Sequence, residues 1–240
     1  MKDTLDSLDT VIISIAQGVG GFLSKICSPA AEEFGLLLRD RVSYWRLMHL
    51  KAIVEKAERK MGRVSRKDML KAHPRIVARI LDHGSWADTD DLHEMWAGLL
   101  VSSCTKGGKD DSNLLFVNLL AQLSSSEVRI INYACLKSGK YRGTDGITYA
   151  SHLAVPFSDL QKEAQLEDPE RCIRELEHLM SMGLLESWHK PMPYTSMVNL
   201  TPSLLALQLF VRCQGVGQSP AEYFQLSHEH NGVESNQARS

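Results

Sequence analysis

Paired cysteines are absent from this sequence. Its five cysteines are scattered and form no CxxC pair: Cys27, Cys104, Cys135, Cys172 and Cys213. A disulfide framework or a zinc site needs thiols at suitable spacings. We therefore interpret all five as small, reduced interior side chains of a cytoplasmic protein, and we expect neither a bound metal nor a cofactor.

Known catalytic motifs are also missing. The densest group of possible acid, base or metal-ligating residues is Asp90, Asp91, His93 and Glu94. It has neither the central glycine of a calcium loop nor the HExxH pattern of a zinc protease. Acids at the start of a helix are explained by the helix dipole alone. We therefore predict that the protein is not an enzyme.

No apolar run is long enough to cross a bilayer as one helix. The longest charge-free stretch near the N-terminus, between Asp9 and Lys25, has 15 residues. As a helix it would extend about 22 Å, against roughly 30 Å of hydrocarbon. The sequence therefore predicts no single spanning helix, although contact with the membrane surface stays open.

Residues 1–27 carry a heptad repeat. Apolar residues recur at alternating steps of three and four, at Leu5, Leu8, Ile12, Ile15, Val19, Phe22 and Ile26. This pattern is typical of a helix packed along another helix, in the same chain or in a second copy. The first five are therefore candidates for a protein interaction, and Gly18, Gly20 and Gly21 predict a hinge or a close backbone contact.

One long helix is predicted from Ser28, a suitable N-cap before Pro29, to Gly62. Its apolar face changes near Trp45, and we expect the residues that precede the change to lie in the core: Phe34, Leu38, Val42 and Trp45. The second half should dock through Leu47, Leu50, Val54, Ala57 and Met61. No proline or glycine interrupts the middle, so a continuous helix that bridges two surfaces is preferred to a broken one.

The charge is uneven along the chain. Residues 39–79 contain 13 basic and 4 acidic residues, although the whole chain has a formal net charge of −2. The candidates for contact with an anionic partner are Arg39, Arg41, Arg46, Lys56, Arg59, Lys60, Arg63, Arg66 and Lys67. Two explanations stay open: the basic and acidic parts attract each other within one fold or dimer, or the basic surface serves an external anionic partner.

The last third predicts a winged-helix-like domain. Helices are expected at 124–137, 157–165 and 170–182, followed by two short strands, 184–188 and 197–200, and a closing helix to Cys213. The 170–182 helix carries more acids than arginines, which disfavours DNA reading. Trp188, Met192 and Tyr194 of the expected two-stranded wing are candidates for a protein contact.

A mainly α fold with four parts follows from these patterns. We predict an amphipathic helix at 1–27, a helical domain with the basic long helix at 28–123, the winged-helix-like domain at 124–213 and a flexible polar tail at 214–240.

Several segments resemble one bacterial family. The stretch PAAEEFGLLLRDRVSYWR, the later LHEMWAGLL, LSSSEVRIINY and the terminal LTPSLLALQLFVRC resemble, in this order, the abortive infection alpha (Abi-alpha) family. The resemblance covers about residues 28–213 and implies a cytoplasmic protein of bacterial phage defence, without supplying a catalytic residue.

Our leading hypothesis is a non-enzymatic defence protein that works through protein contacts and self-association. One alternative is a regulator or sensor that binds nucleic acid, without base specificity, through the basic 39–71 region. Another is a membrane-acting toxin that uses residues 5–26.

Overall fold

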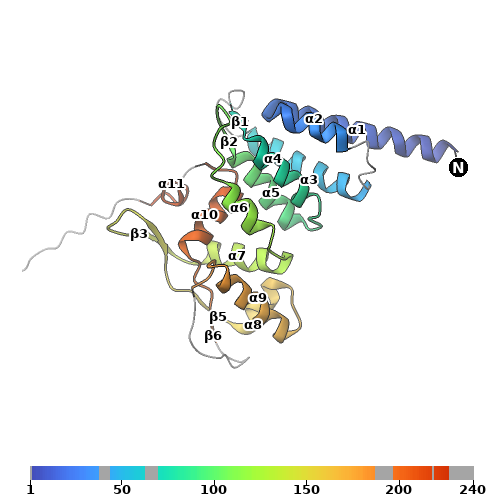
Figure 1. Cartoon of the computed structure of the whole chain (residues 1–240). Helices are drawn as coiled ribbons and strands as arrows, with labels where there is room; N and C mark the ends of the chain where they lie inside the picture. Colours follow the sequence, from blue (N-terminus) through green and yellow to red (C-terminus); the bar gives the residue numbers. More distant parts are fainter. Residues whose placement is uncertain (1, 38–43, 63–69, 187–196, 218, 227–240) are drawn as a thin grey trace, which may run out of the picture.

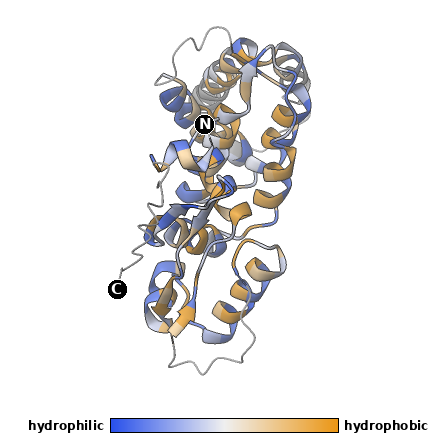
Figure 2. Cartoon of the chain, turned by 90° about the vertical axis from the view of Figure 1, so that its left-hand side faces the viewer, coloured by the Kyte–Doolittle hydropathy of each residue, from blue (hydrophilic) through white to orange (hydrophobic). Residues whose placement is uncertain are grey.

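The computed structural model describes residues 2–37, 44–62, 70–186, 197–217 and 219–226, and before residue 63 it describes only the side chains of 13–32 and 45–62. Within these ranges the fold is mainly helical, as the sequence predicts, with three small antiparallel two-stranded sheets. Figure 2 shows apolar and polar residues alternating along most of the helices, as expected for helices packed around a shared interior.

The first half of the chain forms six helices in the described ranges, α1 (Lys2–Ile26), α2 (Ser28–Leu37), α3 (Tyr44–Met61), α4 (Pro74–Gly84), α5 (Asp90–Ser102) and α6 (Leu114–Leu120). The second half adds α7 (Ser125–Lys137), α8 (Phe157–Ala164), α9 (Pro169–Ser181), α10 (Leu204–Cys213) and α11 (Pro220–Tyr223). The strand pairs are β1 (Leu70–Ala72) with β2 (Cys104–Lys106), β3 (Lys140–Arg142) with β4 (Thr148–Ala150), and β5 (Ala154–Pro156) with β6 (Met197–Asn199). Figure 1 shows their arrangement.

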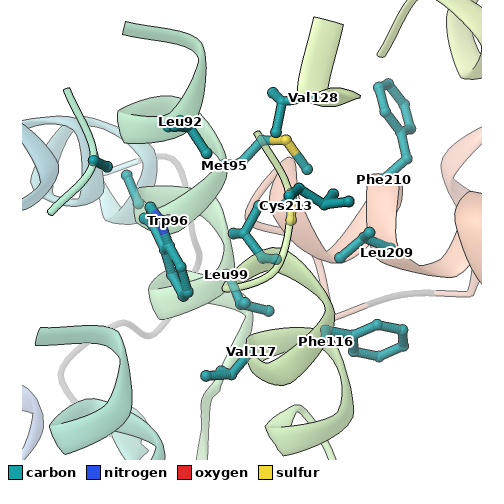
Figure 3. Close-up of a cluster of buried hydrophobic side chains, with 14 of the residues drawn as sticks. Leu92, Met95, Trp96, Leu99, Phe116, Val117, Val128, Leu209, Phe210 and Cys213 are labelled. Carbon is teal, nitrogen blue, oxygen red and sulfur yellow. The ribbon is translucent and has the colours of Figure 1, made fainter. Parts of the chain in front are cut away.

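Helix α5 lies at the centre of the core. Its residues from Leu92 to Ser102 are buried on nearly every side, with Glu94 as the exception. Its most extensive contacts are with α3, followed by α10. Figure 3 shows its side chains Leu92, Met95, Trp96 and Leu99 beside side chains of α6, α7 and α10. The buried apolar residues form one cluster from Ile15 to Cys213, so the core continues across the boundary predicted at 123/124. That boundary stays a prediction.

Helix α5 lies very close to the C-terminal end of α10 at Gly98. A Cβ atom on Gly98 would lie 1.6 Å from the carbonyl oxygen of Cys213 and 2.3 Å from its carbonyl carbon. Only a residue without a side chain allows this approach, so Gly98 determines how closely the two central helices pack.

The N-terminal helix α1 is continuous through its glycines. A Cβ atom on Gly18, Gly20 or Gly21 would meet nothing within 4 Å, so the predicted close backbone contact is wrong, while the alternative of a hinge stays a prediction. Ile15 and Val19 are buried, together with the residues Phe22, Leu23 and Ile26 that follow on the same helix. The N-terminal end of α1 extends beyond the other elements (Figure 1).

The predicted helix Ser28–Gly62 is described as two helices, α2 and α3, and the joint between them lies outside the described residues. The second apolar stripe is confirmed, because its five members are buried. The core position expected for Trp45 is wrong, because this residue is 44% exposed. It packs at the surface against His49 and Trp86, with ring centroids 4.2 and 5.9 Å away. Phe34, Leu38 and Val42 lie outside the described side chains.

The helices predicted in the last third are confirmed, and Ser124 and Glu127 form the expected capping box at α7. The predicted pairing of 184–188 with 197–200 stays a prediction, because residues 187–196 lie outside the described part, but beside it the backbone N–H of Glu186 donates to the carbonyl oxygen of Thr201 at 3.0 Å. β6 pairs with β5, which precedes α8 and was not predicted, and Val155 and Val198 lie opposite each other, both buried. In the described part of 184–188, only Leu185 forms a bridge, with Pro202. The winged-helix arrangement itself stays a prediction.

The region after residue 214 is not entirely a free tail. Ser219 and Glu222 form a capping box that starts α11. The following Phe224 stacks on Phe210 of α10, with ring centroids 6.3 Å apart. The described part of the predicted polar tail therefore includes a short helix that packs on the core, because two aromatic residues outweigh its polar composition.

Candidate functional site

The cations of α3 meet the acids of α5. The Nζ atom of Lys56 lies 2.8 Å from Oδ1 of Asp90 and 2.7 Å from Oε1 of Glu94. The other carboxylate oxygen of Glu94 lies 3.0 Å from Nζ of Lys60. The side chain of Lys56 is only 10% exposed. We call these four residues the charge cluster; in it, two of the candidate cations are paired with acids of the same chain.

The ionisation of the charge cluster follows from these contacts. Burial alone would lower the pKa of Lys56, but its hydrogen bonds to Asp90 and Glu94 outweigh burial and raise it. For Glu94, burial would raise the pKa, but hydrogen bonds from Lys56 and Lys60 outweigh it and lower the pKa below its ordinary value. The contacts therefore favour the charged forms of both groups.

Acid should weaken the contribution of Glu94 to the stability of the fold. Because the pKa of Glu94 is lowered on folding, its contribution is complete above the unfolded-state pKa of about 4.5 and is lost as the pH falls through the lower folded-state pKa. We expect Glu94→Gln to lower the urea midpoint of unfolding at neutral pH. The difference from the wild type should shrink below about pH 4.5. A difference that is constant from neutral to acidic pH would contradict this prediction.

Arg46 is attached to the end of α4. Its Nε and Nη2 atoms donate to Oγ of Ser85 at 2.9 and 2.7 Å, and Nη2 lies 3.5 Å from a carboxylate oxygen of Asp82. The guanidinium group also lies over the ring of Trp86, 4.4 Å from its centroid. Arg46 therefore makes its polar contacts within the chain, as Lys56 and Lys60 do.

The other candidate cations have different positions. Arg59 is exposed, and no acidic side chain of the described ranges forms an ion pair with it. Five more lie outside the described side chains: Arg39, Arg41, Arg63, Arg66 and Lys67. The structure thus gives intramolecular partners to three of the nine candidates, while the role of the other six stays a prediction.

The candidates for a protein interaction divide in a similar way. Ile15 and Val19 are 8% and 2% exposed, so they pack within their own chain and are not available to a second copy. The side chains of Leu5, Leu8, Ile12, Trp188, Met192 and Tyr194 lie outside the described part. Of the N-terminal repeat, the positions before residue 13 therefore remain candidates for an external contact.

The acidic group at the start of α5 does not converge on one point. Asp90 and Glu94 face lysines, Asp91 lies 3.6 Å from Arg129, and His93 contacts the carbonyl oxygen of Ala87 and the ring of His49. In the ranges that the structure describes, no three His, Cys, Asp or Glu side chains are placed to hold a metal ion. The sequence placed these acids at a helix start but did not identify their partners.

The cysteines are buried and free, as the sequence predicts. Burial raises the pKa of Cys104 and of Cys135 to about 12, so both thiols are protonated at neutral pH. Separately, no helix among the described residues combines the length and the apolar character that a membrane span requires.

The comparison with protein families decides to which family the chain belongs. A family model described as "Abortive infection alpha" matches residues 46–212, which is more than half of the chain. The chain belongs to the abortive infection alpha family. This confirms the resemblance seen in the sequence. No curated protein and no solved structure matches the chain.

The abortive infection alpha match includes the charge cluster and the central helix α5. It begins at Arg46, within α3, and ends at Arg212, within the last turn of α10. Two residues inside this range were missed in the sequence: His49, which faces His93, and Trp86, which is 60% exposed. The position of Trp86 just after the end of a helix could have indicated an exposed aromatic side chain. No local pattern could have indicated the contact of His49, because it joins residues 44 positions apart.

Proposed function

We propose that this member of the abortive infection alpha family acts in phage defence without catalysis, through protein contacts and self-association. The observation that carries the proposal is the charge cluster. Affinity for nucleic acid comes largely from cations free to contact phosphates. Because Lys56 and Lys60 already hold Asp90 and Glu94, a phosphate would have to displace these acids. This favours a protein partner over a polyanion.

The N-terminal end of α1 is the proposed surface for self-association. The heptad positions Ile15 and Val19 pack in the chain's own core, while the helix continues toward the N-terminus beyond the other elements (Figure 1). The same repeat continues there in the sequence through Ile12, Leu8 and Leu5. A heptad repeat longer than the core that it packs against offers its remaining positions to a second helix.

A winged-helix-like module is the second part of the proposal. The order α7, β3, β4, β5, α8, α9, β6 and α10, with β5 paired to β6, supports it. On α9, Glu175 is nearly buried and accepts a hydrogen bond from Ser124 at 2.6 Å, which ties this helix to the start of α7. We propose that this module contacts protein, with Trp188, Met192 and Tyr194 as its candidate residues.

Light scattering tests the self-association. The full chain should be an oligomer, and a variant lacking residues 2–12 should be a monomer, because the truncation removes heptad positions that precede the packed part of α1. Leu5→Gln combined with Leu8→Gln should act in the same direction. Ser7→Gln, on the same turns but outside the repeat, is the matched control and should leave the oligomer intact. A monomeric full chain would remove self-association from the proposal.

Two binding measurements separate the alternatives. Binding of a labelled DNA or RNA duplex at about 50 mM salt that weakens steeply with added salt would favour the nucleic-acid regulator. Co-sedimentation with vesicles of anionic lipid, abolished by the truncation of 2–12, would favour the membrane-acting toxin. We expect neither.

A further inference from the structure

Two histidines face each other between α3 and α5. Nδ1 of His49 lies 3.0 Å from Nε2 of His93, and the same Nε2 atom lies 2.9 Å from the carbonyl oxygen of Ala87, in the loop before α5. His93 is 8% exposed, and the Nε2 atom of His49 is buried without a hydrogen-bond partner among the described residues. We call His49 and His93 the histidine pair.

The contacts determine which nitrogen atoms carry protons. The carbonyl oxygen of Ala87 can only accept, so Nε2 of His93 must carry a hydrogen and donate it. This N–H also points toward Nδ1 of His49, which must then act as an acceptor and carry no proton. In the observed arrangement His49 is therefore neutral.

A proton added to His49 does not fit this arrangement. It would bind Nδ1 and place a second N–H against the N–H of His93. His93 could accept it only by moving its own proton to Nδ1, and it would then lose the hydrogen bond to Ala87. We propose that the histidine pair is a proton-sensitive contact, which joins α3 to the loop before α5 when His49 is neutral and separates when His49 is protonated.

The surrounding charges support this direction. Burial lowers the pKa of His49, the nearby His93 lowers it further, and Asp88 opposes the shift only in part. Three cations of α3 have partners of their own: Arg46 pairs with Asp82, and Lys56 and Lys60 pair with Asp90 and Glu94. His83 of α4 stacks on Trp96 instead. Because the folded state binds the proton less readily, stability is greatest above the ordinary histidine pKa of about 6.5 and falls as the pH decreases.

Trp45 provides a direct readout. Its ring lies edge-on to that of His49, with centroids 4.2 Å apart, and its exposure keeps it outside the core. A protonated imidazole quenches indole fluorescence more strongly than a neutral one, and separation of the rings would also change the emission. We expect the fluorescence of the full chain to change as the pH falls below about 6.5, and its urea midpoint to fall over the same range.

Three variants decide the test. His49→Gln should remove at least half of both pH-dependent changes, and Trp45→Phe should remove the fluorescence change while keeping the shift in urea midpoint. His152→Gln, which changes an exposed histidine outside the pair, should retain both. If the wild type shows neither change, or if His49→Gln responds as the wild type does, the proposal is overturned. His49 is only half-buried, so this variant should remain folded.

Discussion

Replacing Gly98 with alanine should destabilise the protein by about 3 kcal/mol or more, the upper end of the range for overpacking. Alanine favours a helix over glycine by about 1 kcal/mol, so propensity alone predicts the opposite sign. The added methyl carbon, however, would lie 1.6 Å from the carbonyl oxygen of Cys213. Its other close contacts are also backbone atoms, of Cys213 and Gly215, which cannot turn aside as a flexible side chain can. Helix α10 must therefore shift away from α5.

The urea midpoint, measured by circular dichroism, checks this result, and Gly20→Ala is the matched control. Gly20 also lies inside a helix, but its added methyl group would meet nothing within 4 Å. That variant should be neutral or more stable by up to about 1 kcal/mol. Equal stability of the two variants would contradict the close approach of α5 and α10. If Gly98→Ala does not fold, Gly98→Ser should fail as well while Gly20→Ser folds.

Much of the fold could be predicted from local patterns. The apolar stripe from Leu47 to Met61 and the capping box at Ser124 are confirmed, because each depends on residues within one or two helical turns. The pairing of β5 with β6 was missed, because it joins residues more than 40 positions apart through strands of only three residues. Such short strands have too few positions for an alternating pattern to identify them.

The candidate site shows the same limit. The sequence revealed a basic segment and an acidic remainder, but it left open whether the two meet inside one chain. Lys56 and Glu94 are 38 positions apart, and only the packing of α3 on α5 places them 2.7 Å from each other. The core position predicted for Trp45 was wrong for a related reason. Its apolar ring suggested the core, although its actual neighbours, His49 and Trp86, lie at the surface.

Replacing Lys56 with methionine should destabilise the protein by about 2 kcal/mol, within the range for hydrogen bonds to charged groups. Methionine retains an apolar chain of similar length, so packing is largely kept and the loss reports on the ammonium group. Asp90 and Glu94 are 82% and 44% exposed, so water can solvate the abandoned carboxylates. This keeps the loss below that of a fully buried ion pair, which is roughly 3–5 kcal/mol. Chemical denaturation at neutral pH measures it.

Lys51→Met is the matched control on the same helix. Lys51 is 40% exposed and lies 3.7 Å from Glu55, which is 52% exposed, so its loss should be below about 1 kcal/mol. A double-mutant cycle of Lys56→Met with Glu94→Gln should give a coupling energy, since the two groups share a contact. If Lys56→Met costs no more than Lys51→Met and the cycle shows no coupling, the ammonium group of Lys56 is not held by α5 in solution. Lys56 would then be free for an anionic partner, and the argument against nucleic acid would lose its basis.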